Sequence, residues 1–188
     1  QILFWRELLS KYPGADVIVE VKCSQALIEE VKRLGGKPFF YKTGHSLIKA
    51  KMKEIGAVFT GEMSGHFFFA DEYFGFDDAL YAGARLLRIL SKANEPISAL
   101  FADVPKYYAT PETRIGCPEE YKQKVIDVLI DRFRRKGYEI IDVDGLRVQF
   151  PKGWGLVRAS NTQPVLVARC EGRTPEALKS IARELKEA

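Results

Sequence analysis

Apolar positions in the first hundred residues follow two different periods. Short β-branched or aromatic runs are typical of strands buried in a sheet, whereas apolar residues spaced three or four apart indicate amphipathic helices. The predicted strands are residues 16–21, 39–41 and 57–60, and the predicted helices are residues 3–12, the stretch from Ser24 to Gly35 and the stretch from Ser46 to Gly56. This alternation predicts a mostly parallel sheet covered by helices.

A fourth apolar run, residues 67–69, precedes another predicted helix. Asp77 or Asp78 is placed to cap this helix, because a carboxylate accepts hydrogen bonds from free amides at a helix start. The apolar positions that mark its period are Leu80, Ala84, Leu87 and Leu90.

The pattern changes after residues 101–108. A strand ending near Ile115 and a long helix over residues 119–136 come first, followed by runs at residues 138–143 and 146–150. The Asp144-Gly145 pair between these runs is a strong hairpin signal. Two further strands, residues 156–157 and 165–169, and a helix from Pro175 complete an α+β pattern with an antiparallel sheet.

These two styles predict two domains, residues 1–104 and 105–188. The fold class is α/β plus α+β: a mostly parallel α/β/α sandwich followed by a small antiparallel-sheet domain. The chain has no Met at position 1 and enters a helix at once, which indicates a piece of a longer chain.

The composition is typical of a globular protein with a core, at 46% hydrophobic and 29% charged residues. No apolar run approaches the about 20 residues that a membrane-spanning helix needs, and we expect no membrane partner. The 3 cysteines lie far apart without metal-like spacing, so we expect reduced thiols and a cytoplasmic protein. The net charge of +4 does not require nucleic acid, and none is expected as a partner.

The most informative polar segment is residues 61–66, Gly-Glu-Met-Ser-Gly-His, which joins two apolar runs. Its glycines allow backbone conformations closed to other residues. Glu62 and Ser64 are separated by one residue, so their side chains can point the same way and hydrogen-bond a polyhydroxyl ligand. Glu62 is also a candidate general acid or base.

Both histidines, His45 and His66, are predicted in loops after strands, at the sheet edge where open α/β sheets bind ligands. Lys22 belongs to another strand-to-helix junction at the same predicted edge. The alternative for each is a solvated surface side chain. Metal binding is not expected, because no third His or Cys is suitably spaced.

A second polar segment, residues 158–162, concentrates phosphate ligands. Arg158 can bind two phosphate oxygens at once, and Ser160, Thr162 and the loop amides can complete a nest around an anion. The alternative is an ordinary turn, since Ser, Asn and Thr favour turns. Gly153-Trp154-Gly155 before it reads as a turn with one packing aromatic residue. The two polar segments together suggest a phosphosugar ligand.

At these residues the chain resembles the α-D-phosphohexomutases, and within them the phosphomannomutase/phosphoglucomutase branch. Residues 61–66 are similar to the family's sugar-specificity loop, and residues 158–164 to its fourth-domain phosphate loop. Residues 21–23 and 42–47 also match. The resemblance covers nearly the whole chain as the third and fourth of four domains, and it implies a TATA-box-binding-protein-like fold for the second. Met63 stands where phosphoglucosamine mutases place Gln, which favours a mannose or glucose enzyme.

The resemblance implies an isomerase of carbohydrate metabolism. A phosphoserine phosphoprotein, using Mg²⁺, interconverts hexose 1-phosphate and hexose 6-phosphate through a hexose 1,6-bisphosphate. Glu62 and Ser64 would hold sugar hydroxyls, while Lys22, Thr43, His45 and His66 would line the site. Lys22, His45 and His66 are the candidates for an acid–base role. Arg158, Ser160, Asn161 and Thr162 would hold the phosphate that is not reacting.

The family's phosphoserine loop and magnesium loop, which belong to its first two domains, do not occur in these 188 residues. We therefore expect N-terminal domains of the same parent chain as partners, with Mg²⁺ bound there, and an isolated chain that binds glucose or mannose phosphates without turnover. The alternative hypothesis is a stand-alone, non-catalytic sugar-phosphate-binding module.

Overall fold

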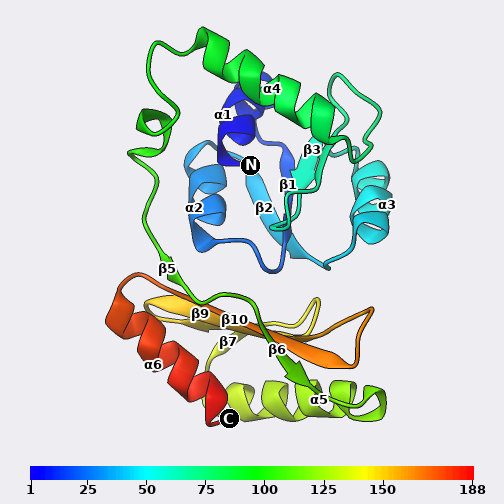
Figure 1. Cartoon of the computed structure of the whole chain (residues 1–188), viewed down its shortest axis with the longest axis vertical. Helices are drawn as coiled ribbons and strands as arrows, with labels where there is room; N and C mark the ends of the chain where they lie inside the picture. The colour runs from blue at the N-terminus through cyan, green and yellow to red at the C-terminus, as the bar shows by residue number, and fades with distance from the viewer. The chain divides into compact units, whose positions relative to one another are not determined.

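The computed structural model describes residues 1–188, which form two compact units, Gln1–Pro105 and Lys106–Ala188 (Figure 1). Each unit has its own hydrophobic core. Each is described by itself below.

The first unit alternates helices and strands before it ends in a short hairpin, a long helix and a single 3₁₀ turn. Its elements are α1 (Ile2–Lys11), β1 (Asp16–Glu20), α2 (Gln25–Arg33), β2 (Lys37–Tyr41), α3 (His45–Ile55), β3 (Phe59–Gly61), β4 (Phe67–Phe69), α4 (Ala79–Lys92) and η1 (Ala99–Phe101). The predicted helices and strands are therefore confirmed, with boundaries that move by a few residues.

The strands of the first unit join in two ways. β1 and β2 are parallel, with Ile18 opposite Phe39, whereas β3 and β4 form an antiparallel hairpin. β3 lies beside β1 in Figure 1, and the Thr60 hydroxyl donates a 2.8 Å hydrogen bond to the Ile18 carbonyl. The hydroxyl therefore ties the hairpin to the parallel pair.

Helices cover both faces of these strands, because successive side chains of a strand point to opposite faces. Val17 and Val19 pack in the core shared with α1 and α2, while Ile18 packs with Ile48 and Met52 of α3. This three-layer arrangement is the predicted α/β/α sandwich.

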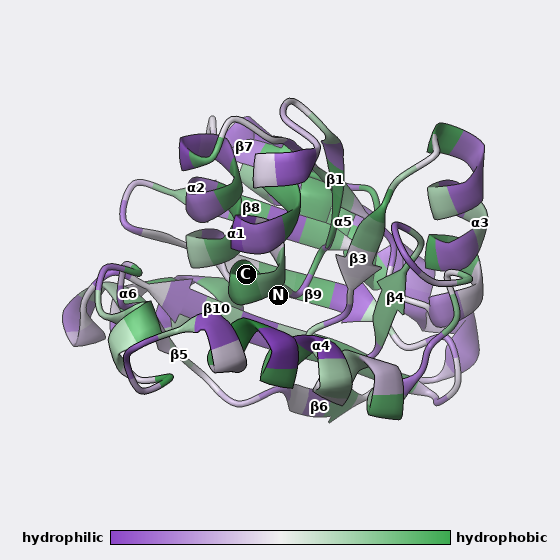
Figure 2. Ribbon diagram, turned by 90° about the horizontal axis from the view of Figure 1, so that it is seen from above, coloured by the Kyte–Doolittle hydropathy of each residue, from purple (hydrophilic) through white to green (hydrophobic).

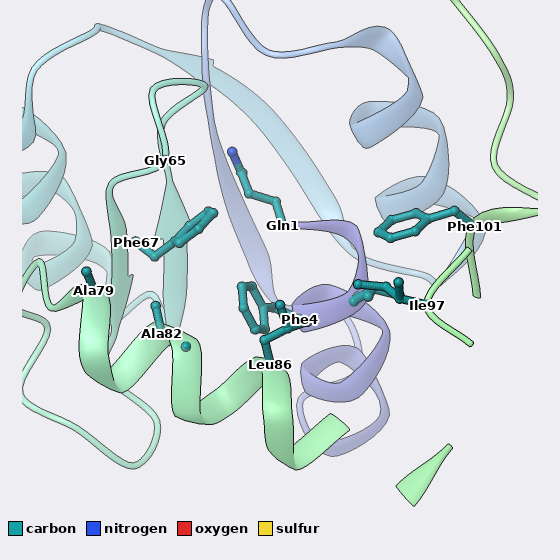
Figure 3. Close-up of a pocket in the computed structure, with 11 residues that line it drawn as sticks. Gln1, Phe4, Gly65, Phe67, Ala79, Ala82, Leu86, Ile97 and Phe101 are labelled. Carbon is teal, nitrogen blue, oxygen red and sulfur yellow. The ribbon is translucent and has the colours of Figure 1, made fainter. Parts of the chain in front are cut away.

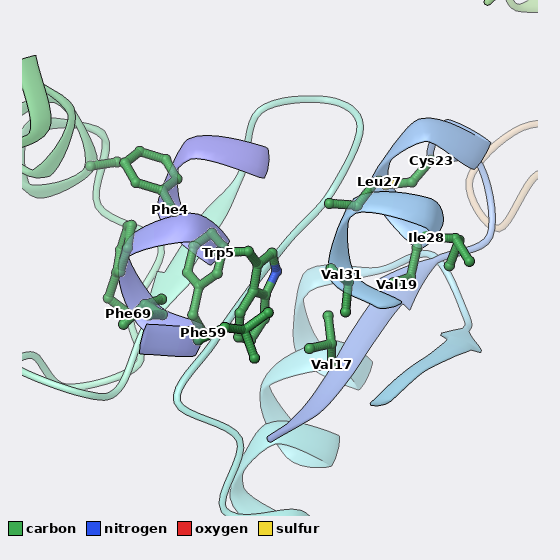
Figure 4. Packing of buried hydrophobic residues seen from close by; sticks show 13 residues of the cluster. Phe4, Trp5, Val17, Val19, Cys23, Leu27, Ile28, Val31, Phe59 and Phe69 are labelled. Carbon is green, nitrogen blue, oxygen red and sulfur yellow. The ribbon is translucent and has the colours of Figure 1, made fainter. Parts of the chain in front are cut away.

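Aromatic rings fill the core on the α1 side (Figure 4). Phe4 meets Phe59 and Phe69 edge-on, at ring-centroid distances of 5.4 and 5.0 Å. Trp5 is fully buried beside Phe59. Edge-to-face contacts of this kind add to the free energy gained by burying the rings.

The prediction for the apolar face of α4 is wrong. Leu80 and Leu87 are 88% and 67% exposed, whereas Ala82 and Arg85 are buried. The Arg85 guanidinium donates to Asp71 at 2.8 Å and Glu7 at 3.2 Å, so its burial is compensated. Figure 2 shows α4 banded in purple and green along its length. Hydrophobic periodicity predicts that the leucines of a helix are buried, and it gives no sign of an arginine that is buried with its ion-pair partners.

The second unit is an antiparallel sheet with helices on one face. Its elements are β5 (Tyr108–Ala109), β6 (Thr113–Gly116), α5 (Glu119–Arg135), β7 (Glu139–Ile141), β8 (Leu146–Phe150), β9 (Gly153–Ala159), β10 (Val165–Gly172) and α6 (Pro175–Lys186). The strand order is β5-β10-β9-β8-β7, and β6 also pairs with β10. Ile126 of α5 and Ile181 of α6 pack in one core with Val148 of β8.

The Asp144-Gly145 hairpin prediction is confirmed by the antiparallel pairing of β7 and β8. Gly145 has φ 81°, and a Cβ atom there would lie 2.5 Å from the Val157 carbonyl oxygen. Both the conformation and the close approach therefore require glycine.

The predicted turn at Gly153-Trp154-Gly155 is wrong, because these residues open strand β9. A Cβ at Gly153 would lie 2.1 Å from the Glu171 carbonyl oxygen, and one at Gly155 would lie 3.3 Å from Leu185 of α6. The glycines here permit close packing within a strand rather than a turn.

Candidate functional site

The first group of polar residues lies where β1, β2 and β3 end. Lys22 follows β1, Thr43 follows β2, and Glu62 follows β3. Hydrogen bonds join these loops: the Gly44 amide donates to Glu62 Oε1 at 2.9 Å, and the Met63 amide donates to Glu20 Oε2 at 3.2 Å. The sugar-site residues predicted in this unit therefore come from neighbouring, connected loops.

Residues 61–66, which we call the sugar loop, form a tight turn between β3 and β4. The Glu62 amide donates to the His66 carbonyl at 2.9 Å, and the Gly65 amide donates to the Glu62 carbonyl at 3.1 Å. Gly65 adopts φ 93°, and a Cβ at Gly61 would lie 2.5 Å from the Phe67 ring. The two glycines are needed for different reasons, one for conformation and one for space.

Glu62 is 6% exposed, and both its carboxylate oxygens have partners. Oε1 accepts from the Gly44 amide, and Oε2 accepts from the Ser64 hydroxyl at 3.1 Å. The two side chains point the same way, as their spacing predicts. Each carboxylate oxygen can accept a second hydrogen bond, so a sugar hydroxyl can join this arrangement.

The histidines differ in their surroundings. His45 is not in a loop as predicted: it is the first residue of α3, after Gly44, and its side chain is exposed. His66 ends the sugar loop, and its Nδ1 lies 2.5 Å from Asp77 Oδ2. A carboxylate at Nδ1 fixes the ring orientation and leaves Nε2 to face a ligand.

The structure excludes the alternative that Lys22 is a solvated surface side chain. It is 8% exposed, and its Nζ lies 4.0 Å from Glu20 Oε1. A buried ammonium beside a buried carboxylate keeps its charge compensated. Thr43 is half-buried and donates its hydroxyl to the same Glu20 oxygen at 2.5 Å.

The second group of polar residues, residues 158–163, lies in the second unit and is called the phosphate loop. Arg158 is in β9, and its Nε donates to Asp144 Oδ2 at 2.9 Å. Asp144 belongs to the β7–β8 turn, so the hairpin orients the guanidinium. The remaining N–H groups of a guanidinium held in this way can serve a phosphate.

Ser160 shapes the phosphate loop from within. Its hydroxyl accepts from the amides of Thr162 at 3.3 Å and Gln163 at 3.2 Å, and its own amide donates to the Val165 carbonyl. These two amides are therefore used inside the loop rather than in the anion nest that we expected. The side chains of Asn161 and Thr162 are exposed.

Lys122 of α5 is a functional candidate that sequence reasoning missed. It is 4% exposed, and its Nζ donates to the carbonyls of Ser160 at 2.7 Å and Gln163 at 3.1 Å. Its ammonium also pairs with Glu119 Oε2 at 2.6 Å, so Lys122 holds two carbonyls of the phosphate loop without adding net charge. Its position within a helical charge pattern gave no signal of this contact.

Glu20, Asp77 and Asp144 were also missed. Each is a carboxylate that orients a predicted site residue, respectively Thr43, His66 and Arg158. Such partners are found by distance in the fold and not by spacing in the sequence.

A hollow of about 320 Å³ in the first unit is lined by α1, α4 and the β3–β4 hairpin (Figure 3). Phe4, Phe67 and Leu86 are among its mostly apolar lining residues, and Gly65 is its contact with the sugar loop. Because a hexose phosphate needs charged and hydroxyl-binding partners, the polar loops are the better candidate site.

No group of three or more His, Cys, Asp or Glu side chains is arranged to hold a metal ion. The residues present therefore do not fit a Mg²⁺ site. No helix has both the length and the apolar character required to cross a bilayer.

The chain combines an α/β/α unit, which has polar loops at its strand ends, with an antiparallel α+β unit, in which residues 158–163 form a further polar loop. Residues 2–108 match the family model described as phosphoglucomutase/phosphomannomutase, alpha/beta/alpha domain III. Residues 95–188 match the C-terminal domain model of the same family. The chain belongs to the phosphoglucomutase/phosphomannomutase family.

Relatives of known name support this membership. The chain is 49% identical over 180 residues to a phosphomannomutase/phosphoglucomutase of Pseudomonas aeruginosa, covering 96% of this chain and 39% of that protein. It is 48% identical to a phosphoglucomutase of Neisseria meningitidis, covering 98% and 40%. A crystal structure of a phosphoglucomutase/phosphomannomutase family protein from Burkholderia thailandensis shares 46% identity with a TM-score of 0.90, covering 99% of this chain and 39% of that one.

The chain therefore spans about 39% of the length of the curated relatives that it matches. The family and the fold class predicted from the sequence are confirmed.

Proposed function

We propose that this chain provides the sugar and phosphate recognition of an enzyme that interconverts hexose 1-phosphate and hexose 6-phosphate. The observation that carries the proposal is the Glu62 carboxylate, which is held by the Gly44 amide and the Ser64 hydroxyl at the strand ends. Family membership and the phosphate loop of the second unit support it.

Glu62 and Ser64 bind two sugar hydroxyls in this proposal. The carboxylate accepts hydrogen bonds from the sugar, the Ser64 hydroxyl can also accept one, and the bond from Ser64 orients the carboxylate. Lys22, Thr43, His45 and His66 line the same site. Lys22, His45 and His66 are the groups that can donate or remove the proton of the reacting hydroxyl.

Arg158, Ser160, Asn161 and Thr162 bind the phosphate that does not react. Arg158 supplies charge-assisted hydrogen bonds, while Asn161 and Thr162 present exposed polar side chains. Lys122 fixes the loop backbone through the Ser160 carbonyl, while its charge is balanced by Glu119. Phosphate affinity is therefore expected to depend most on Arg158.

The proposed reaction needs a part of the parent protein beyond these residues. A phosphoserine gives its phosphoryl group to a hexose phosphate hydroxyl, which loses its proton and becomes the bisphosphate ester. After the intermediate reorients, its other phosphoryl group returns to the serine. The serine and its Mg²⁺ belong to upstream domains in this proposal, and the isolated chain binds hexose phosphates without turning them over.

A calorimetric or NMR titration of the 188-residue chain tests the proposal. Glucose 1-phosphate and mannose 1-phosphate should bind more tightly than either glucose or inorganic phosphate alone. Glu62→Gln should weaken phosphosugar binding by about tenfold or more, because a strong acceptor is replaced by a donor. The matched control is Glu54→Gln on α3, where an exposed carboxylate pairs with Lys51.

Phosphosugar binding no tighter than glucose binding would contradict the proposal. Equal binding by the Glu62 and Glu54 variants would remove Glu62 from the site.

A further inference from the structure

Glu20 is a buried carboxylate for which the proposed reaction gives no direct role. It is the last residue of β1 and is 0% exposed. An isolated buried carboxylate is strongly unfavourable, so the groups that surround it decide whether its charge is tolerated.

The two oxygens of Glu20 serve different loops. Oε1 accepts from the Lys22 amide at 3.2 Å and from the Thr43 hydroxyl at 2.5 Å. Oε2 accepts from the Met63 amide at 3.2 Å and lies 3.9 Å from the Cys23 thiol. The Lys22 ammonium, 4.0 Å from Oε1, supplies the opposite charge.

These donors come from the loops after β1, β2 and β3. One side chain therefore connects each loop that carries a proposed sugar-site residue in this unit: Lys22 and Thr43 directly, and Glu62 through its neighbour Met63. Glu62 adds a separate link, between the sugar loop and the Gly44 amide.

The charge on Glu20 matters as well as its shape. An ionised carboxylate offers lone pairs on both oxygens, whereas a glutamine side chain accepts at one oxygen only and presents an NH₂ group on the other side. In glutamine, either the Lys22–Thr43 pair of donors or the Met63 amide must face another donor. The loops cannot all keep their present positions.

We propose that Glu20 is a positioning residue that fixes Lys22, Thr43 and the sugar loop relative to one another without contacting the sugar. The inference rests on the proposed function, because it gives that site its rigidity. It differs from a general stabilising role in that its effect is confined to these loops.

Glu20→Gln in the 188-residue chain tests the inference, with Glu54→Gln as the matched control. In ¹H–¹⁵N spectra the amide signals of Lys22, Thr43 and Met63 should all move in the Glu20 variant and stay in place in the control. Glucose 1-phosphate affinity should fall about tenfold or more. Met52→Val, a core change on α3, supplies a variant of reduced stability that should keep its affinity.

Four results would overturn the inference. The first is unchanged amide signals in the Glu20 variant. The second is a loss of glucose 1-phosphate affinity in Met52→Val as large as that in Glu20→Gln, because reduced stability alone would then explain both losses. If wild type binds glucose 1-phosphate and the Glu20 variant binds it equally well, the inference alone fails. If wild type does not bind glucose 1-phosphate, the proposed function fails and the inference with it.

Discussion

Individual side chains of the candidate site are held by carboxylate partners that lie 11 to 23 positions away in the sequence. Arg158 is oriented by Asp144, His66 by Asp77, and Thr43 by Glu20. Such partners reduce the freedom of the ligating groups before a ligand arrives. Preorganisation of this kind increases affinity because less ordering is left for the binding step.

Replacing Arg158 by Lys should weaken binding of inorganic phosphate and glucose 1-phosphate by about tenfold or more. Lysine keeps the charge but loses the planar fork that bonds Asp144 through Nε at 2.9 Å and presents paired donors. The measurement is a titration at fixed ionic strength, with Arg134→Lys on exposed α5 surface as the control. An Arg158 variant that binds phosphate as tightly as the control would remove Arg158 from the phosphate site.

Among the elements, α1 and α2 are joined by a partly buried ion pair between Arg6 and Glu30. Arg6 Nε donates to Glu30 Oε1 at 2.5 Å, and Glu30 also accepts from Arg33. Glu30 is 2% exposed. The hydrogen bond from Arg33 and the contacts with Arg6 together lower the pKa of Glu30 to about 2, against the opposing effect of burial.

This shift predicts a pH-dependent stability. A carboxylate whose pKa is depressed in the folded state contributes stability above its unfolded pKa, near 4.5, and loses it as pH falls toward about 2. The free energy of unfolding of wild type should therefore exceed that of Glu30→Gln by about 1–3 kcal/mol at pH 6. This difference should shrink as the pH falls from about 4.5 toward about 2.

Urea unfolding in a Trp154→Phe background measures this difference, because Trp5 is then the one remaining tryptophan and reports on the first unit. A difference between wild type and Glu30→Gln that stays constant from pH 6 to pH 2.5 would contradict the assigned pKa.

Secondary structure was predictable where a local signal is strong. Ser24 caps α2 through a 3.1 Å bond from the Ala26 amide, and the Asp144-Gly145 turn joins β7 to β8. The buried face of α4 was not predictable, because the carboxylates that pair with buried Arg85, Asp71 and Glu7, lie 14 and 78 positions away in the sequence. The turn predicted at Gly153-Trp154-Gly155 was wrong for a similar reason. These glycines allow close packing against residues that lie further along the chain.

The candidate site divides in the same way. Residue types and spacing suggested Glu62, Ser64 and Arg158, since these groups suit sugar hydroxyls and phosphate. The partners Glu20 and Lys122 could not be found from the sequence, because their contacts join distant positions. Glu20 and Thr43 are 23 positions apart, and Lys122 and Ser160 are 38 positions apart.

At the scale of the whole molecule, the fraction of its relatives' length that the chain covers decides which functions can be assigned to it. The chain spans about 39% of the curated proteins that it matches, so the activity of the full-length protein remains a proposal for these residues. Recognition and phosphoryl transfer are assigned to different parts of the parent protein in this proposal.

The isolated chain should show no conversion of glucose 1-phosphate to glucose 6-phosphate, because the proposed serine and Mg²⁺ ligands belong to other domains. A coupled assay with Mg²⁺ and glucose 1,6-bisphosphate measures this, and a full-length family member provides the positive control. Turnover by the chain alone, lost on His45→Ala, would contradict this division.

The most direct test of the central claim is to map glucose 1-phosphate binding onto the chain by ¹H–¹⁵N NMR. We predict that the amide signals of residues 42–45 and 61–66 in the first unit, and of residues 158–163 in the second unit, move on addition of the ligand. Glucose alone should not reproduce these shifts. Shifts confined to the residues around the hollow of Figure 3, such as Phe4, Phe67 and Leu86, would contradict the account.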